Sequence, residues 1–233
     1  MVKSRQTALI YRVVAFIVAS AGFLSMSGIA QGDFAPEIMM FYTMQSNLIG
    51  IALFGVLIYK TISDLRSNQS GHPGYYPQLV MVVSVILLIT LIVYWAMLAP
   101  QTFTMTTEFD LWSFGNLAVH TYTPLLVLFD YILFSPPGHL RYRDVYYILI
   151  YPFGYVLFTS IIGFLGHVYY ISPSDGLPVR FPYFFYDFDR IGAWGLVFIA
   201  VLMLFFLIIG HVYYLIDKRR KRKATTTSSY PRH

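Results

Sequence analysis

The chain has no cysteine among its 233 residues, which excludes disulfide bonds, thiolate metal sites and a cysteine nucleophile. Charged residues are also scarce, at 12% of the chain, whereas 57% of the residues are hydrophobic. The mean hydropathy of +0.61 is far above that of an ordinary soluble domain. This balance predicts an integral membrane protein.

Six apolar runs are long enough to cross about 30 Å of hydrocarbon as helices of about 20 residues. They cover residues 8–30, 38–59, 79–99, 111–134, 145–164 and 191–216. The first run is longer than the apolar part of a signal peptide and has no obvious cleavage site, so we expect it to be the first span. The sequence therefore predicts an all-α, polytopic bundle of six transmembrane helices over residues 1–217, followed by a basic, disordered tail over residues 218–233. No internal repeat is visible that would support an inverted-repeat transporter.

Basic residues are distributed unevenly between the two sides of such a bundle. Only Arg180 and Arg190 fall in loops on one side, together with most of the acidic residues. Every other Lys and Arg, including Arg12 and the cluster at 218–223, is assigned to the opposite side. The positive-inside rule then makes both termini cytoplasmic. We expect the basic cluster to hold anionic headgroups of membrane lipids and to set topology, and not to bind nucleic acid.

A polar stripe interrupts the second run, in the stretch FYTMQSNLIG at residues 41–50. Four of its residues share one helical face through i, i+3, i+4 and i+7 spacing: Thr43, Ser46, Asn47 and Gly50. This face must meet other helices or a cavity, because lipid satisfies no polar group. Polar residues of this kind commonly line helix contacts in membranes, so the stretch alone favours packing and function equally.

The fourth run, GNLAVHTYTPLLVLFDYILF, carries Asn116, His120 and Thr123 on one stripe. An ionisable residue inside a span is costly, which makes His120 a functional candidate. Counted at 1.5 Å per residue from the outer ends of their runs, Thr43 lies roughly 8 Å deep and His120 roughly 13 Å deep. A hydroxyl and an imidazole at similar depth can form a nucleophile and general-base pair.

Two acids are candidate partners of this imidazole. Asp130 lies about 15 Å from His120 along the same helix, so it cannot orient the ring, and we interpret it as an interfacial or helix-packing acid. Asp187 belongs to the long outer loop at 166–190 and could fold back to hold His120 in the required tautomer. The loop is rich in Pro, Gly and aromatic residues, so we expect it to be ordered at the membrane interface, with a lid over the site as one option.

Four short motifs occur in the order and spacing of a known family: FYTMQSNLIG, HTYTPLLVLFDYILF, YPFGY at 151–155 and FPYFFYDF at 181–188. Through them the chain resembles the androgen-induced and androgen-dependent protein family, and more closely its bacterial six-span branch. The animal members are transmembrane threonine hydrolases that cleave fatty acid esters of hydroxy fatty acids. The resemblance implies that Thr43 is the catalytic threonine and His120 the catalytic histidine. The outer loop departs from the branch pattern, with FPYFFYD in place of YPYPFLD, which bears on lid shape and substrate range.

The sequence thus predicts a plasma-membrane hydrolase of lipid esters, in which Thr43 attacks the ester and His120 serves as base and then acid. The candidates for oxyanion donors or for supporting roles are Gln45, Ser46, Asn47, Asn116 and Asp187. The expected partners are a lipid ester substrate and membrane lipids, and the chemistry needs neither a metal nor a cofactor.

Two other functional classes remain open at this point. A non-enzymatic lipid- or small-molecule-binding protein, or a transporter, would use the polar stripe to line a passage, and it predicts more intramembrane charge and more broken helices. Haem-based electron transfer needs paired axial ligands deep in facing helices, and only His120 is well placed for that role.

Overall fold

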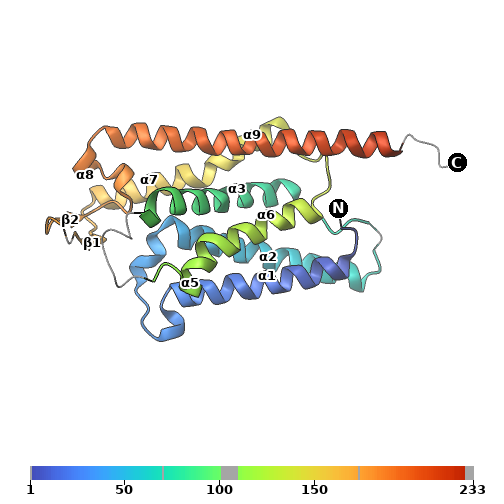
Figure 1. Cartoon of the computed structure of the whole chain (residues 1–233), viewed down its shortest axis with the longest axis horizontal. Helices are drawn as coiled ribbons and strands as arrows, with labels where there is room; N and C mark the ends of the chain where they lie inside the picture. The colour runs from blue at the N-terminus through green and yellow to red at the C-terminus, as the bar shows by residue number, and fades with distance from the viewer. Residues whose placement is uncertain (1, 70, 101–109, 173, 229–233) are drawn as a thin grey trace.

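The computed structural model is an elongated helical bundle that describes residues 2–69, 71–100, 110–172 and 174–228, without the side chains of 226–228 (Figure 1). Six helical segments in these ranges are long and apolar enough to cross a membrane: Arg5–Met26, Tyr42–Arg66, Pro77–Leu98, Phe114–Phe134, Tyr142–Phe164 and Trp194–Thr225. The predicted all-α, six-span bundle is therefore confirmed. The protein is an integral, multi-pass membrane protein.

Three spans are single α-helices: α1 (Arg5–Met26), α2 (Tyr42–Arg66) and α9 (Trp194–Ser228). The third span consists of α3 (Pro77–Val93) and the π-helical turn η3 (Tyr94–Leu98), and the fourth consists of α5 (Phe114–Leu117), the π-helical turn η4 (Ala118–Tyr122) and α6 (Thr123–Phe134). The fifth consists of the 3-10 segment η5 (Tyr142–Leu149) and α7 (Ile150–Phe164). The connections carry the short 3-10 turns η1 (Ile29–Gln31), η2 (Pro36–Met40) and η6 (Phe184–Tyr186), the helix α8 (Phe188–Ile191), and the antiparallel strands β1 (Tyr170–Ile171) and β2 (Pro178–Val179). In this two-residue ladder Tyr170 lies opposite Val179.

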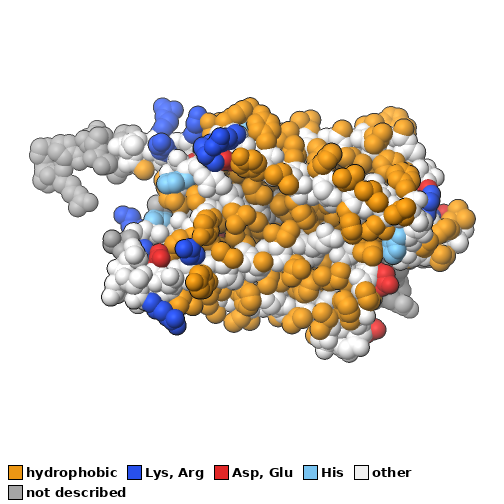
Figure 2. Space-filling view, turned by 180° about the vertical axis from the view of Figure 1, so that it is seen from behind, with side chains coloured by type: hydrophobic (Ala, Val, Ile, Leu, Met, Phe, Trp, Pro, Cys, Tyr) orange, Lys and Arg blue, Asp and Glu red, His pale blue; other side chains and the backbone are white. Residues whose placement is uncertain are grey.

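Helix α3 occupies the centre of the bundle and packs against α2, α6 and α9, while α1 lies along α2. In the most apolar stretch of the third span, 56% of the residues are buried. The corresponding share in α9 is 17%, so α9 exposes most of its surface to lipid. Both chain termini lie at one end of the bundle, and β1, β2 and α8 lie at the other end (Figure 1). Lys and Arg gather at the first end and acidic residues at the second, with a band of hydrophobic side chains between them (Figure 2).

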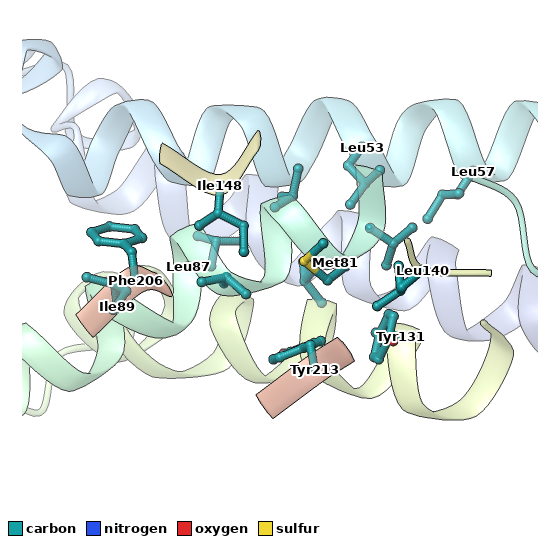
Figure 3. Close-up of a cluster of buried hydrophobic side chains, with 14 of the residues drawn as sticks. Leu53, Leu57, Met81, Leu87, Ile89, Tyr131, Leu140, Ile148, Phe206 and Tyr213 are labelled. Atoms are coloured by element: carbon teal, nitrogen blue, oxygen red, sulfur yellow. The ribbon is translucent and has the colours of Figure 1, made fainter. Parts of the chain in front are cut away.

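Apolar side chains from α2, α3, η5 and α9 fill the centre of the bundle (Figure 3). Leu57, Met81, Leu87 and Ile148 are almost completely buried there. Because lipid is itself apolar, such a core stabilises the fold mainly through close packing and not through removal of surface from water.

Small residues let α1 approach the fourth span closely. A Cβ atom on Gly22 would lie 2.1 Å from the Cβ of Ala118, so only glycine fits at this position. Ala15 and Ala19 are also fully buried on the same helix. This contact fixes the turn η4, which carries His120, against α1.

Arg12, which the charge count groups with the cytoplasmic-side residues, is not a surface charge. Its side chain is buried in the bundle, and the guanidinium binds both carboxylate oxygens of Asp130 at 2.8 and 3.2 Å and the hydroxyl of Thr61 at 2.8 Å. It also lies over the rings of Tyr75 and Phe134. Asp130 is thus a helix-packing acid, because its ion pair joins α6 to α1.

Two element boundaries differ from those expected. The extended backbone of Phe41, which follows the 3-10 turn η2, delays the start of α2 to Tyr42, so Thr43 lies in the first helical turn and not roughly 8 Å along a helix starting at 38. The last helix, α9, continues through the basic cluster at 218–223 and ends at Ser228, although disorder was expected from residue 218 onward. Lys and Arg are good helix formers, and a long preceding helix removes the cost of nucleation. The rest of the expected tail, 229–233, lies outside the described residues.

Candidate active site

Thr43 and His120 line the same cavity, which has a volume of about 340 Å³ and lies toward the end of the bundle that carries β1, β2 and α8. Its polar lining comes from four spans or loops: Thr43, Tyr94, Asn116, His120 and Tyr183. We call this cavity the histidine chamber. Thr43 keeps 8% of its surface exposed and His120 keeps 5%, so both are buried in the bundle while they border the chamber.

The imidazole of His120 is held on two sides. Its Nδ1 lies 3.0 Å from the backbone carbonyl oxygen of Asn116. A carbonyl oxygen only accepts hydrogen bonds, so Nδ1 carries the proton and Nε2 carries the lone pair. The ring of Tyr94 stacks on the imidazole with 3.5 Å between centroids and 14° between planes. This environment prepares Nε2 to accept a proton.

His120 and Tyr94 each lie in a π-helical turn, a feature that often marks functional sites. The turn η4 is explained by its sequence. The N–H of Thr123 donates to the carbonyl of Ala118, and the following residue, Pro124, has no N–H. The carbonyl of Val119 therefore lacks a helical donor, and it accepts a 2.9 Å hydrogen bond from Nδ2 of Asn47 instead.

The polar stripe of α2 supports the backbone of Thr43. Nδ2 of Asn47 donates to the carbonyl of Thr43 at 2.8 Å, and the hydroxyl of Ser46 lies 3.0 Å from the same oxygen and 3.2 Å from the hydroxyl of Thr90. Nε2 of Gln45 donates to the carbonyl of Met39. Gln45, Ser46 and Asn47 do not line the histidine chamber. Their polar groups position the first turn of α2, so this geometry fits a supporting role better than oxyanion binding.

Asn116, the fourth amide or hydroxyl residue proposed for a supporting or oxyanion role, does line the histidine chamber. Its Nδ2 donates to the carbonyl of Leu111 at 2.7 Å, which uses one of two amide hydrogens. Its Oδ1 is buried and has no hydrogen-bond partner among the described residues. The side chain can therefore contribute polar contacts to a bound molecule.

The structure does not bring Asp187 to His120. The carboxylate of Asp187 accepts hydrogen bonds from Arg190 at 2.6 Å and from the backbone N–H of Asp189 at 3.1 Å, and so begins helix α8. The expected orienting partner of His120 is replaced by the carbonyl of Asn116, since a backbone group four residues earlier reaches Nδ1 without a loop folding inward. Asp187 stabilises the outer loop.

Tyr183 is a site residue that the sequence did not single out within the motif FPYFFYDF. Its hydroxyl oxygen accepts a 3.1 Å hydrogen bond from the backbone N–H of Tyr42, directly before Thr43. Burial raises the pKa of Tyr183 to about 12, although hydrogen bonds with Tyr155, Tyr42 and Thr43 partly offset the rise. The phenol is therefore protonated at neutral pH. The outer loop thus contacts α2 directly beside Thr43 through this residue.

A second cavity, of about 70 Å³, also reaches Thr43. It lies between α3, α7 and α9, and its walls include Ile89, Val156, Met203 and Phe206. We call it the apolar chamber. Thr43 thus stands between two cavities of different character.

No family model, curated protein or solved structure matches the chain. The functional assignment therefore depends on the sequence motifs and the geometry of the site.

Proposed function

We propose that the protein is an intramembrane hydrolase of lipid esters, with Thr43 as nucleophile and His120 as general base. The observation that carries this proposal is that both residues line the histidine chamber, while the hydrogen bond to Asn116 places the lone pair of the neutral His120 ring on Nε2. The resemblance to the androgen-induced and androgen-dependent family, whose catalytic threonine and histidine fall on these two positions, supports the same assignment.

The reaction proceeds in two halves that use the same pair. The hydroxyl oxygen of Thr43 attacks the ester carbonyl as Nε2 of His120 takes its proton, and the ester C–O bond then breaks while His120 returns that proton to the leaving alkoxide. A water molecule attacks the resulting acyl-threonine with His120 again as base. The acid leaves, and the proton returns to the oxygen of Thr43.

The oxyanion formed in each half needs hydrogen-bond donors that are already in position. Tyr183 fits this role because its oxygen accepts from Tyr42, while its own O–H stays protonated owing to the raised pKa. The second amide hydrogen of Asn116 is a further candidate. We assign the remaining polar residues of the α2 stripe to positioning Thr43.

The site lies toward the acidic end of the bundle. In this proposal that end lies in the outer half of a bacterial plasma membrane, which the positive-inside rule supports as far as orientation is concerned. A lipid ester can reach this depth from the bilayer, and water can reach it from the outer surface. The substrates in this proposal are therefore fatty acid esters of hydroxy fatty acids or similar lipid esters, and membrane lipids surround the protein.

Labelling with a fluorophosphonate probe tests the proposal directly. Purified protein in detergent should be labelled on Thr43, and Thr43→Ala should abolish labelling. Thr123→Ala is a matched control, because Thr123 is a buried threonine that lines neither chamber and whose hydroxyl has no hydrogen-bond partner among the described residues. Absence of labelling in folded parent protein, together with no hydrolysis of lipid esters, would refute the hydrolase.

The alternative is a membrane binding protein or transporter, and two observations favour it. The buried ion pair of Arg12 and Asp130 supplies intramembrane charge, and the π-helical turns interrupt two spans. Neither charged residue lines a chamber, however, so the ion pair does not form part of a passage through either cavity. A binding protein would retain a lipid ester unchanged, which the same purified protein would reveal by mass spectrometry of bound lipid.

A further inference from the structure

The two chambers meet at Thr43. Four residues line both of them: Thr43, Tyr94, Leu98 and Tyr183. A molecule whose reacting carbonyl lies at Thr43 can therefore extend into both cavities at once. The question is which part of an ester each cavity accepts.

The apolar chamber offers almost no free hydrogen-bonding group. The hydroxyl of Tyr155 donates to the carbonyl of Met40 at 3.0 Å, and the hydroxyl of Tyr186 lies 2.9 Å from that of Thr159. The hydroxyl of Thr90 is engaged with Ser46. Tyr42, whose hydroxyl lies 3.5 Å from the carbonyl oxygen of Ile86, and the polar residues shared with the histidine chamber lie at its border. The other walls are aliphatic and aromatic carbon, so this chamber suits hydrocarbon and penalises polar groups.

The histidine chamber is also lined mostly by apolar side chains, but it adds polar groups that the apolar chamber lacks. The side-chain oxygens of Tyr94 and Asn116 are buried without a hydrogen-bond partner in the described ranges. The lone pair of Nε2 of His120 adds a third polar group to the same cavity. Buried polar groups of this kind are usually satisfied by ligand or water.

We propose that the apolar chamber is an acyl-chain subsite, and that the histidine chamber takes the alcohol portion of the ester and the hydrolytic water. This inference rests on the proposed hydrolase. The chemistry leads to the same assignment, because His120 must reach both the leaving alkoxide and the attacking water. The acyl chain stays bonded to Thr43 between these steps, so it must occupy the other cavity.

Phe206 forms the inner end of this subsite. It lies on α9 far from the outer end of that helix, and it is found with Ile89 at one end of the central apolar cluster (Figure 3). A cavity of about 70 Å³ has room for only a short stretch of hydrocarbon chain. Longer chains must leave between α7 and α9, past the half-buried side chains of Val156 and Met203.

Chain-length dependence of hydrolysis tests the assignment. With 4-nitrophenyl esters in detergent micelles, kcat/KM should rise about fourfold per methylene for short acyl chains and then level off once the chamber is filled. Phe206→Ala should move that break toward longer chains, because removal of the phenyl ring lengthens the chamber. Phe54→Ala is the matched control, because Phe54 is equally buried in the core but lines neither chamber. If the alanine variant does not fold, Phe206→Leu can replace it. This change removes less volume and should shift the break by a smaller amount. An unchanged break in the folded Phe206 variants would overturn the subsite.

Photocrosslinking gives a readout that does not depend on turnover. Decanoic acid with a diazirine near its methyl end should label peptides of α7 and α9 around Val156 and Met203, in Thr43→Ala protein as well as in the parent. Val156→Phe, which fills the chamber, should suppress that labelling. Crosslinks in the histidine chamber, near Met26 or Ile38, would overturn the inference. Crosslinks at Val156 without any ester hydrolysis would instead keep the chain-binding site and remove the hydrolase.

Discussion

The ring of Tyr94 lies flat on the imidazole of His120, and each of these residues belongs to a π-helical turn in a different span. Both turns have the same sequence feature, because Pro100 and Pro124 follow the residue that closes each turn. A proline cannot donate to the helix carbonyl five residues earlier. The widened turns therefore arise from local sequence, and they set the two rings against each other.

Replacement of the catalytic pair should abolish hydrolysis without unfolding the protein. Thr43→Ala and His120→Ala should each lower kcat/KM about a thousandfold or more, and the double variant should be scarcely slower than either, because the two residues act as a unit. Thr43→Ser keeps the hydroxyl and should retain part of the activity.

A second histidine serves as the control for this experiment. His211 also holds its Nδ1 against a carbonyl four residues earlier, that of Leu207, but it lines neither chamber. His211→Ala should leave kcat/KM within about twofold of the parent. Full activity in folded Thr43→Ala would contradict the assignment.

Loss of the stacked ring should reduce activity by misplacing the imidazole. An aromatic pair contributes about 0.5–1.5 kcal/mol beyond burial, so Tyr94→Ala should lower kcat by about 2- to 12-fold through this contact alone. Tyr94→Phe keeps the ring and should retain most of the activity. Equal losses in both variants would show that the hydroxyl, and not the stacking, is what matters.

Restoring a backbone donor at position 124 should disturb the site while preserving the fold. In Pro124→Ala the new N–H can donate to the carbonyl of His120, four residues earlier. The N–H of Thr123 can then move from the carbonyl of Ala118 to that of Val119, which now binds Asn47. We expect the turn to change toward regular α-helix and to rotate His120, so hydrolysis should fall while the melting temperature stays equal or rises. A thermal-shift assay beside the kinetic assay separates these effects, and unchanged kinetics would show that η4 persists without proline.

The orientation of the bundle is open to a direct test. A reporter after residue 233 and a reporter in the loop near Asn68 should both be cytoplasmic, because almost all Lys and Arg gather at that end. Dual alkaline phosphatase and fluorescent-protein fusions distinguish the two sides. An external signal from either fusion would place the candidate site on the cytoplasmic side.

Much of the architecture could be predicted from sequence because the bilayer imposes a simple rule on helix length and polarity. Thr43 and His120 stood out for the same reason, since polar groups are conspicuous in an apolar span. Their joint position in one chamber depends on which helices are neighbours in the bundle. Helix neighbours cannot be deduced from a single sequence.

Other parts of the site had only ambiguous signals. Asp187 was conspicuous as an acid in an aromatic loop. Its carboxylate forms an ion pair with the nearby Arg190 and not with His120. Tyr183 is one of 20 tyrosines, so composition could not distinguish it. The π-helical turns were also missed, because Pro124 predicts a local disturbance but not which carbonyl is left free or what binds it.

The ion pair between Arg12 and Asp130 constrains how the protein is made. Arg12 lies in α1, and its partner Asp130 lies three spans later in the chain, so it is synthesised later. Until Asp130 has been synthesised, Arg12 lacks this partner, and an unpaired arginine in the membrane costs about 3 kcal/mol. This cost favours retention of α1 beside the insertion machinery over its early release into lipid. A nascent chain stopped before residue 114 should therefore be cleared faster than the same chain with Arg12→Leu, and equal lifetimes would contradict this. Assembly of the bundle is in this sense coupled to the order of synthesis.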